Sequence, residues 1–235
     1  MKPPFIAVFG VLILCATTAQ AVEITGGSVG LSYSAFTKDT SARRIGIEGS
    51  LEVGYNQNFS SQIDLTYHQL NVTDQDTTTL GLHTIYHVNA ATSLGIFYAI
   101  EDTIGGTFDM YGIEAGHGAG PWAFEGYLGR AEANAVDAEL LGFSARYELA
   151  NEIGVTGAYD DVDVAGVDWS KTSLRVDRDV TADVNLYLEV GAAHVNGAGL
   201  SGSEPFVGLG GTYVFGAARG ATFDARGIAR LLPGL

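Results

Sequence analysis

The stretch Arg44–Asn56, with the sequence RIGIEGSLEVGYN, alternates apolar and polar side chains with a period of two. One face of the extended chain carries the apolar residues Ile45, Ile47, Leu51, Val53 and Tyr55. The other face carries Arg44, Glu48, Ser50, Glu52 and Asn56. This is the period of a half-buried β-strand. The same period continues as far as Phe215, and no helical period of 3.6 residues competes with it before residue 216, so we expect an all-β chain.

The alternation predicts twelve strands, at 24–36, 44–56, 61–70, 78–88, 92–101, 107–117, 121–130, 138–149, 153–160, 169–178, 183–195 and 205–215. Most have close to the about 9–11 residues with which a tilted strand crosses a membrane. Pro121 and Pro205 are expected to open strands, where a missing N–H group costs no ladder bond. Tight turns alternate with longer loops along the chain, as in outer-membrane barrels. The prediction is a closed antiparallel transmembrane β-barrel with meander topology over residues 22–215, with both ends on the short-turn rim.

Two classes of protein fit a long run of alternating strands, a secreted soluble β protein and an outer-membrane barrel. The polar face is rich in Gly, Ser and Thr and holds few Lys and Glu, which suits a crowded, water-filled lumen better than a solvated exterior. Tyr and Trp gather towards the strand ends, as in the aromatic girdles of membrane barrels, although β-propensity alone also enriches them. These features favour the membrane barrel.

The first 21 residues have the pattern of an export signal. Lys2 precedes an apolar run from Phe5 to Ala16, and the small residues Ala19 and Ala21 supply the cleavage pattern. A lipid anchor on Cys15 is disfavoured, because such a site has a small residue before the cysteine and this chain has Leu14. Cys15 is the one cysteine of the chain, so the exported protein is expected to hold no disulfide.

The charge balance excludes one class of partner. Acidic residues outnumber Lys and Arg by 27 to 12, for a net charge of −15, whereas a nucleic-acid partner requires a basic surface. No nucleophile, base and orienting group are fixed together in the sequence, so we expect neither an enzyme nor a cofactor. His68, His83 and His87 are expected to face inward, and one register sets His68 opposite His83. Because His83 and His87 lie about 13 Å apart on one strand, lumen histidines without a metal are favoured.

Charged residues on the polar face are the candidate pore-lining groups. The acids lie on the second to seventh strands: Glu48, Glu52, Asp64, Glu101, Glu114 and Glu125. The bases are Arg44 near the outer rim and Arg146, Lys171 and Arg175 on the eighth to tenth strands. Opposed acidic and basic walls would create a field across a pore. Local pairing of Glu125 with Arg146 and of Arg175 with Glu189 is the favoured alternative. It leaves an acidic wall without neighbouring bases, made of Glu48, Glu52, Asp64 and Glu114.

The segment from Pro205 to Phe215, PFVGLGGTYVF, resembles the closing strand of an outer-membrane protein. It ends aromatic-x-aromatic at Tyr213 and Phe215, and Gly210 stands five residues before Phe215, which is similar to the signal read by the barrel-assembly machinery. The hairpin at 150–161 resembles the repeating unit of the Gram-negative porin family in its alphaproteobacterial form. The resemblance implies a pore in the outer membrane. General porins have sixteen strands, a long third loop and a trimeric state; this chain has twelve predicted strands and a third outer loop of only about 102–106.

The residues after Phe215 depart from the family, whose closing aromatic residue is terminal. Residues 216–235 carry Arg219, Arg226 and Arg230 against one acid, Asp224. Such a tail could plug the lumen from below, touch the acidic barrel or form a disordered end, and a disordered end on the periplasmic side is the commonest case.

The combined expectation is an outer-membrane porin that passes small hydrophilic solutes by passive diffusion and prefers cations. The alternative is a closed-lumen barrel with a structural or surface-interaction role, such as an adhesin or a receptor. The expected partners are outer-membrane lipid and lipopolysaccharide, the barrel-assembly machinery, the diffusing solutes and, in a homo-oligomer, further copies of the chain.

Overall fold

The computed structural model describes residues 23–71, 75–103, 106–133, 136–149, 151–164, 166–197, 199–216 and 220–231. The expected export signal at 1–21 lies outside these residues. Twelve strands form: β1 (Glu23–Phe36), β2 (Arg43–Gly54), β3 (Phe59–Leu70), β4 (Gln75–Asn89), β5 (Thr92–Thr103), β6 (Gly106–Ala119), β7 (Trp122–Ala133), β8 (Val136–Leu149), β9 (Ile153–Val164), β10 (Val167–Thr181), β11 (Val184–Gly197) and β12 (Leu200–Phe215).

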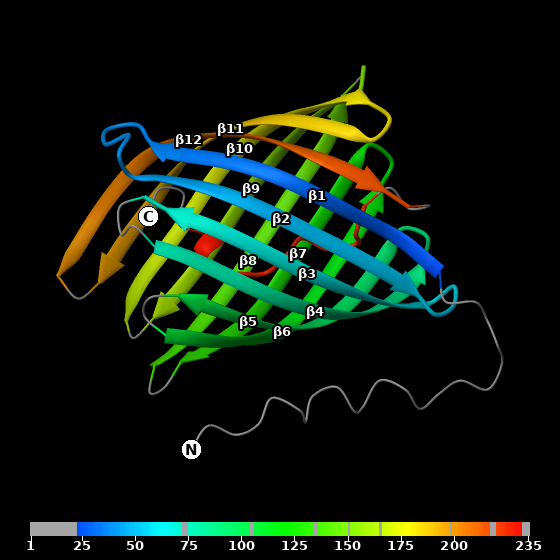
Figure 1. The fold of residues 1–235 in the computed structure, drawn as a ribbon, viewed down its shortest axis with the longest axis horizontal. Helices are drawn as coiled ribbons and strands as arrows, with labels where there is room; N and C mark the ends of the chain where they lie inside the picture. The colour runs from blue at the N-terminus through cyan, green and yellow to red at the C-terminus, as the bar shows by residue number, and fades with distance from the viewer. Residues whose placement is uncertain are drawn as a thin grey trace.

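Each strand pairs antiparallel with the next, and β1 pairs with β12 to close the ring (Figure 1). The closing register joins Gly27 to Phe215 at one rim and Phe36 to Phe206 towards the other. Because the ladder is continuous, the described strands leave no open edge that could pair with another chain. The predicted closed antiparallel meander of twelve strands is confirmed.

The outer surface of the barrel is apolar. Every strand exposes at least one large apolar or aromatic side chain: Leu31, Ile47, Leu65, Leu80, Ile96, Ile113, Leu128, Phe143, Tyr159, Leu174, Leu188 and Leu209. Glu52, Asp64, His83, Glu101 and Glu114 lie on the inner side and are each less than 5% exposed. Charged groups inside and an apolar belt outside invert the arrangement of a soluble protein and fit a barrel surrounded by lipid.

The strands reach further towards the rim of the 37–42 connection than the sequence predicted. The expected loop at 161–168 is largely ladder, because β9 continues to Val164 and β10 begins at Val167. Asp161 pairs with Ser170, and Asp163 pairs with Asp168. A ladder joins backbone groups, so acidic side chains at the rim do not end it, although their polarity in the sequence is typical of a loop.

Pro205 lies inside β12 and does not open it, contrary to the prediction. Its carbonyl accepts a hydrogen bond from the Thr37 N–H group at 2.9 Å, so its backbone polar groups face the β1 side. The N–H group that proline lacks would face the same side, just beyond the last partner pair of β1 and β12, Phe36 and Phe206. The bonds of β12 to β11 are therefore kept.

The C-terminal residues 220–231, which we call the inner segment, lie within the barrel. After β12 ends, this part of the chain runs back through the interior and finishes in a short 3-10 helix, η1 (Ala229–Leu231), drawn in red in Figure 1. The structure thus differs from the expectation of a disordered periplasmic tail. Nothing helical in the described chain is long and apolar enough to span a membrane.

Candidate functional site: the lumen and the inner segment

The inner segment packs against one wall of the lumen, formed by β2 to β7. Phe223 is 3% exposed and Arg226 is 6% exposed, and Ala225, Ala229 and Leu231 are also buried. The contacts begin at Glu52 and Gln62, near the rim where β2 ends and β3 starts. They end at Arg44 and Glu101, near the opposite rim. The segment therefore crosses much of the height of the barrel.

Polar side chains of the wall bind the backbone of the inner segment near its start. The Thr222 N–H donates to Glu52 at 2.8 Å. The Gln62 amide pairs with both backbone groups of Phe223, since it accepts from the N–H at 3.1 Å and donates to the carbonyl at 2.7 Å. The Asp224 N–H donates to Glu125 at 3.2 Å. Three consecutive residues are thus held through their main chain.

The far end of the inner segment is held in the same way. The Ala229 N–H donates to Glu101 at 3.1 Å, and the Ala229 carbonyl accepts from Arg44 at 2.5 Å. Leu231 then joins a buried apolar cluster made by β5 to β9: Phe97, Ala99, Met110, Ala131, Ala138, Leu140 and Val162. This cluster fills the lumen towards the rim opposite the point of entry, so the segment also closes part of that end.

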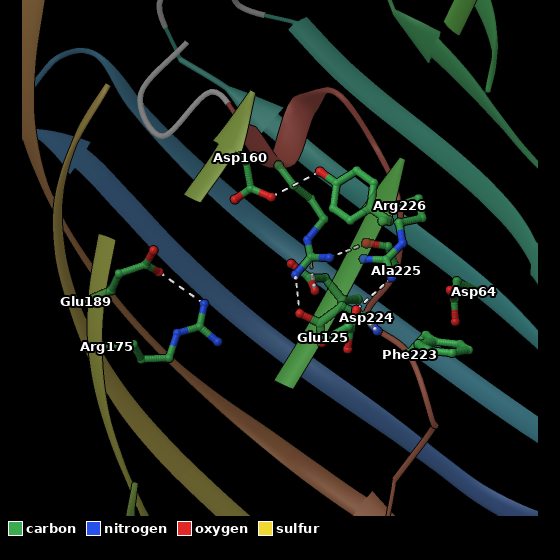
Figure 2. Close-up of polar contacts among 12 residues, drawn as sticks. Asp64, Glu125, Asp160, Arg175, Glu189, Phe223, Asp224, Ala225 and Arg226 are labelled. Atoms are coloured by element: carbon green, nitrogen blue, oxygen red, sulfur yellow. Dashed lines mark hydrogen bonds and ion pairs between the residues drawn. The ribbon is translucent and has the colours of Figure 1, made fainter. Parts of the chain in front are cut away.

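Arg226 is the central charged contact of the inner segment. Its guanidinium donates to Glu114 through Nε at 3.0 Å and Nη2 at 2.8 Å. It also donates to Glu125 through Nη2 at 2.7 Å (Figure 2). The same group lies 4.3 Å from the centre of the Tyr127 ring, within the range of a cation–π contact. One arginine therefore pairs with two carboxylates of β6 and β7 inside a largely enclosed site.

The wall behind Arg226 contains a chain of shared charges. His83 lies between Glu114 and Asp64, with Nδ1 2.6 Å from the first carboxylate and Nε2 2.7 Å from the second. His83 and Asp64 are almost fully buried. Arg226 adds the positive charge that these acids lack, because an unpaired buried carboxylate carries a large desolvation cost.

Arg230 supplies a second cation from the inner segment. Its guanidinium lies 3.5 Å from Asp224 and 4.0 Å from Glu48. The Asp224 side chain is 67% exposed and faces the cavity beside Arg230. Its carboxylate balances part of the positive charge that the segment brings into the lumen.

The opposite wall of the lumen, on β8 to β11, carries its own ion pairs. The Glu189 carboxylate forms ion pairs with Lys171 and Arg175, with N···O distances of 3.2 and 3.1 Å. Arg146 pairs with the Asp177 carboxylate at 2.8 Å. Figure 2 shows the pair of Arg175 and Glu189 apart from the contacts of the inner segment. A cavity of about 800 Å³ lies between this wall and the segment, and both contribute to its lining.

The structure places every candidate pore-lining residue on the inner side of the barrel. Glu48, Glu125, Arg44, Arg146, Lys171 and Arg175 line the cavity. Glu52 and Glu114 instead lie against the inner segment, and Asp64 lies behind them next to His83. The predicted pairing of Arg175 with Glu189 is confirmed, since the two residues are opposite in the ladder.

Two other expected contacts, and the expected absence of bases at the acidic wall, are wrong. Arg146 stands opposite Ala123, two residues from the expected Glu125, so it pairs with Asp177 and Glu125 pairs with the inner segment. The acidic wall is not free of bases, because Arg226 and Arg230 reach it from the tail. His68 stands opposite Thr77, not His83, because the β3–β4 ladder reaches down to Gln75. The arginines of the C-terminal tail were the feature of the sequence that could have indicated the bases that pair with this wall.

The three residues of the expected assembly signal lie on the last strand. Tyr213 is half-exposed on the outer face, and its ring stacks on that of Phe215 at 6.3 Å. Gly210 stands opposite Tyr187, and a Cβ atom there would lie 2.5 Å from the tyrosine hydroxyl. Gly210 therefore has a packing role in the barrel, beside the recognition role that stays a prediction.

Among the described residues, no group of three or more His, Cys, Asp or Glu side chains is arranged to hold a metal ion. The charged side chains of the lumen instead bind each other and the inner segment.

No protein-family model and no curated protein matches the chain. Several solved structures, in contrast, match the fold of the chain. The KdgM porin superposes with a TM-score of 0.62 at 9% identity, over 80% of this chain and 99% of its own. The fold is that of the porin-like outer-membrane barrels. The NanC porin gives 0.61 at 8% identity over 82% and 99%, and the CymD monoaromatic hydrocarbon channel gives 0.52 at 10% over 85% and 90%.

The expected alphaproteobacterial general-porin subfamily stays a resemblance of the sequence.

Proposed function

We propose that this chain is an outer-membrane channel through which small hydrophilic solutes diffuse passively. The observation that carries the proposal is the polar cavity of about 800 Å³ that the inner segment leaves against β8 to β11, inside a barrel with an apolar exterior. The porin-like fold supports the same function. In this proposal the inner segment narrows the lumen and restricts it to small solutes.

The channel is proposed to prefer cations. Acidic side chains outnumber Lys and Arg by eight to six among the residues that line the cavity. The acids are Glu48, Glu125, Glu148, Asp160, Asp177, Asp179, Glu189 and Asp224, and the bases are Arg44, Arg146, Lys171, Arg175, Arg226 and Arg230. The excess is smaller than the bare wall would have, because the inner segment covers Glu52, Asp64 and Glu114. A lining of net negative charge lowers the barrier for cations.

Export through the leader at 1–21, insertion by the barrel-assembly machinery, contact with lipid and lipopolysaccharide, and assembly of copies into a homo-oligomer belong to this proposal. The apolar belt around the strands supports residence in the outer membrane. Fractionation of cell envelopes tests the location, because a secreted soluble protein would not remain with the outer membrane or shift on unboiled gels.

Liposome swelling with sugars of graded size tests the channel function. Liposomes that contain the protein should swell in small sugars and should resist larger ones, because the inner segment restricts the lumen. Swelling at the rate of protein-free liposomes in every sugar would contradict the proposal.

A closed-lumen barrel with a structural or surface-interaction role is the second candidate. The apolar cluster that includes Leu231 favours it, because it fills the lumen towards one rim. In that case neither swelling nor conductance should appear, while insertion and heat stability remain.

A further inference from the structure

We propose that the lumen wall formed by β2 to β7 is a peptide-binding site, and that the inner segment is its exchangeable occupant. The ligand class is a short extended peptide with an aromatic residue followed, three residues later, by an arginine. Phe223 and Arg226 present this pattern in the chain itself. The inference stands independently of whether the barrel conducts solutes.

The wall recognises a main chain. Glu52, Gln62 and Glu125 bind the N–H groups of three consecutive residues, 222 to 224, and Gln62 also donates to the Phe223 carbonyl. Main-chain contacts of this kind bind extended peptides of varied sequence, and pockets for chosen side chains supply the specificity. The wall therefore has the first of the two parts that a peptide site requires.

The second part is a pair of side-chain recesses. The Phe223 ring stacks on His83, with ring centres 6.4 Å apart, and lies over Gly95 and Gly116. A Cβ atom at Gly95 would come within 2.8 Å of the Phe223 ring, so glycine makes the room that this ring occupies. Arg226 fills the neighbouring recess, between two carboxylates and the Tyr127 ring. The two recesses select an aromatic residue and an arginine at this spacing.

The geometry also makes exchange feasible. The inner segment packs mainly on the wall of β2 to β7, with Leu231 joining the cluster that extends to β8 and β9, and it faces the cavity of about 800 Å³ on its other side, so it can leave without opening the barrel ladder. Gly216 and Gly220, at the ends of its connection to β12, both have positive φ, at 90° and 125°. Departure would leave Glu114 and Asp64 with His83 but without Arg226. The wall therefore favours replacement by another cationic peptide over a vacant site.

The test uses the full chain with a protease site in place of residues 217–219, cut after the barrel has folded. A fluorescent peptide of sequence 220–231 is added in excess to the cut protein in detergent, and its anisotropy is followed. The labelled peptide should bind as the cut segment leaves. Peptides with Phe223→Ala or Arg226→Ala should bind at least about tenfold more weakly, as expected for loss of one such anchor.

Two controls make the result decisive. A scrambled peptide of the same composition separates recognition from simple charge attraction, and a barrel with Glu139→Gln on the outer face serves as a matched control for Glu114→Gln in the wall. Equal binding of the native and scrambled peptides would overturn the inference, as would retention of the cut segment in peptide excess. Failure of the channel function would appear separately, as peptide binding by a barrel that gives no liposome swelling.

Discussion

Arg226 and Glu114 meet inside the barrel through two hydrogen bonds, from Nε at 3.0 Å and from Nη2 at 2.8 Å, although the two residues are 112 positions apart in the chain. Glu114 is fully enclosed and also contacts His83. The pair joins the tail of the chain to the middle of the barrel wall. The contents of the lumen, and hence its charge and width, depend on this contact.

Replacement of Arg226 with Gln should release the inner segment. Loss of one partner of a buried ion pair costs about 3–5 kcal/mol, because the carboxylates of Glu114 and Glu125 stay behind unpaired. Single-channel recording should show a higher conductance, and unboiled gels should show a lower melting temperature of the barrel. Arg130→Gln is the control, because Arg130 and Glu139 pair on the exposed surface and such pairs contribute about 0–1 kcal/mol. Identical behaviour of the two variants would contradict the role of Arg226.

Removal of the inner segment should strengthen the preference for cations. Cutting at an engineered site in 217–219 and washing takes Arg226 and Arg230 out of the lumen and uncovers Glu52 and Glu114. The reversal potential across a planar bilayer under a KCl gradient should shift further towards the potassium potential after cutting. The shift should be larger in dilute salt, where charges are screened less, since the Debye length is about 30 Å at 0.01 M. A shift towards chloride would show that the basic wall controls selectivity.

In the intact protein, Glu48 should contribute to cation preference more than exposed acids do. Glu48 lines the cavity, whereas Glu139 lies on the outer face with 78% of its side chain exposed. Glu48→Gln should lower the potassium-to-chloride permeability ratio, and Glu139→Gln should leave it unchanged. The reversal potential under a KCl gradient, measured for each variant, tests this difference. A wild-type channel that prefers chloride would refute the proposed selectivity before any variant is made.

Assembly is predicted to depend on Phe215. Phe215→Ser should lower the yield of inserted, heat-modifiable protein more than Phe143→Ser, because both rings lie on the outer face but only Phe215 closes the last strand. Phe206 is unsuitable as the control, since it is 2% exposed inside the lumen and its loss should cost about 3–5 kcal/mol in packing. Equal yields for the Phe215→Ser and Phe143→Ser variants would contradict the prediction that the last strand carries an assembly signal.

The period of two along the chain was sufficient to predict the barrel. Residues such as Ile45, Ile47 and Leu51 must face lipid together, and a shift of one residue would turn all of them inward. The strand ends at the outer rim were harder to predict, because Asp161 and Asp163 are typical of loops and still pair through their backbone. Pairing across strands also depends on register, which is why Arg175 with Glu189 was predictable and Glu125 with Arg146 was wrong.

The position of the tail could not be derived from local pattern. Residues 220–231 have no strand period, and their main-chain contacts to Glu52, Gln62 and Glu101 join positions more than 100 residues apart. The feature of the sequence that could have predicted the position of the tail is the balance of charge between the lumen wall and the tail. Unpaired acids on the lumen wall and arginines at 226 and 230 complement each other, and burial of the acids makes their pairing necessary.

Cross-linking between the tail and the wall tests the placement of the inner segment most directly. The exported chain has no cysteine if the leader that contains Cys15 is removed, so Gln62→Cys and Phe223→Cys can be joined by a short, reducible thiol cross-linker in a protein with a protease site in 217–219. After cutting, the tail fragment should stay attached to the barrel until reductant is added. The control, Ser173→Cys with Phe223→Cys, places the first cysteine on the far wall of the cavity, and its fragment should leave without reductant when excess peptide of sequence 220–231 is added. Release from the Gln62 variant without reductant would contradict the account.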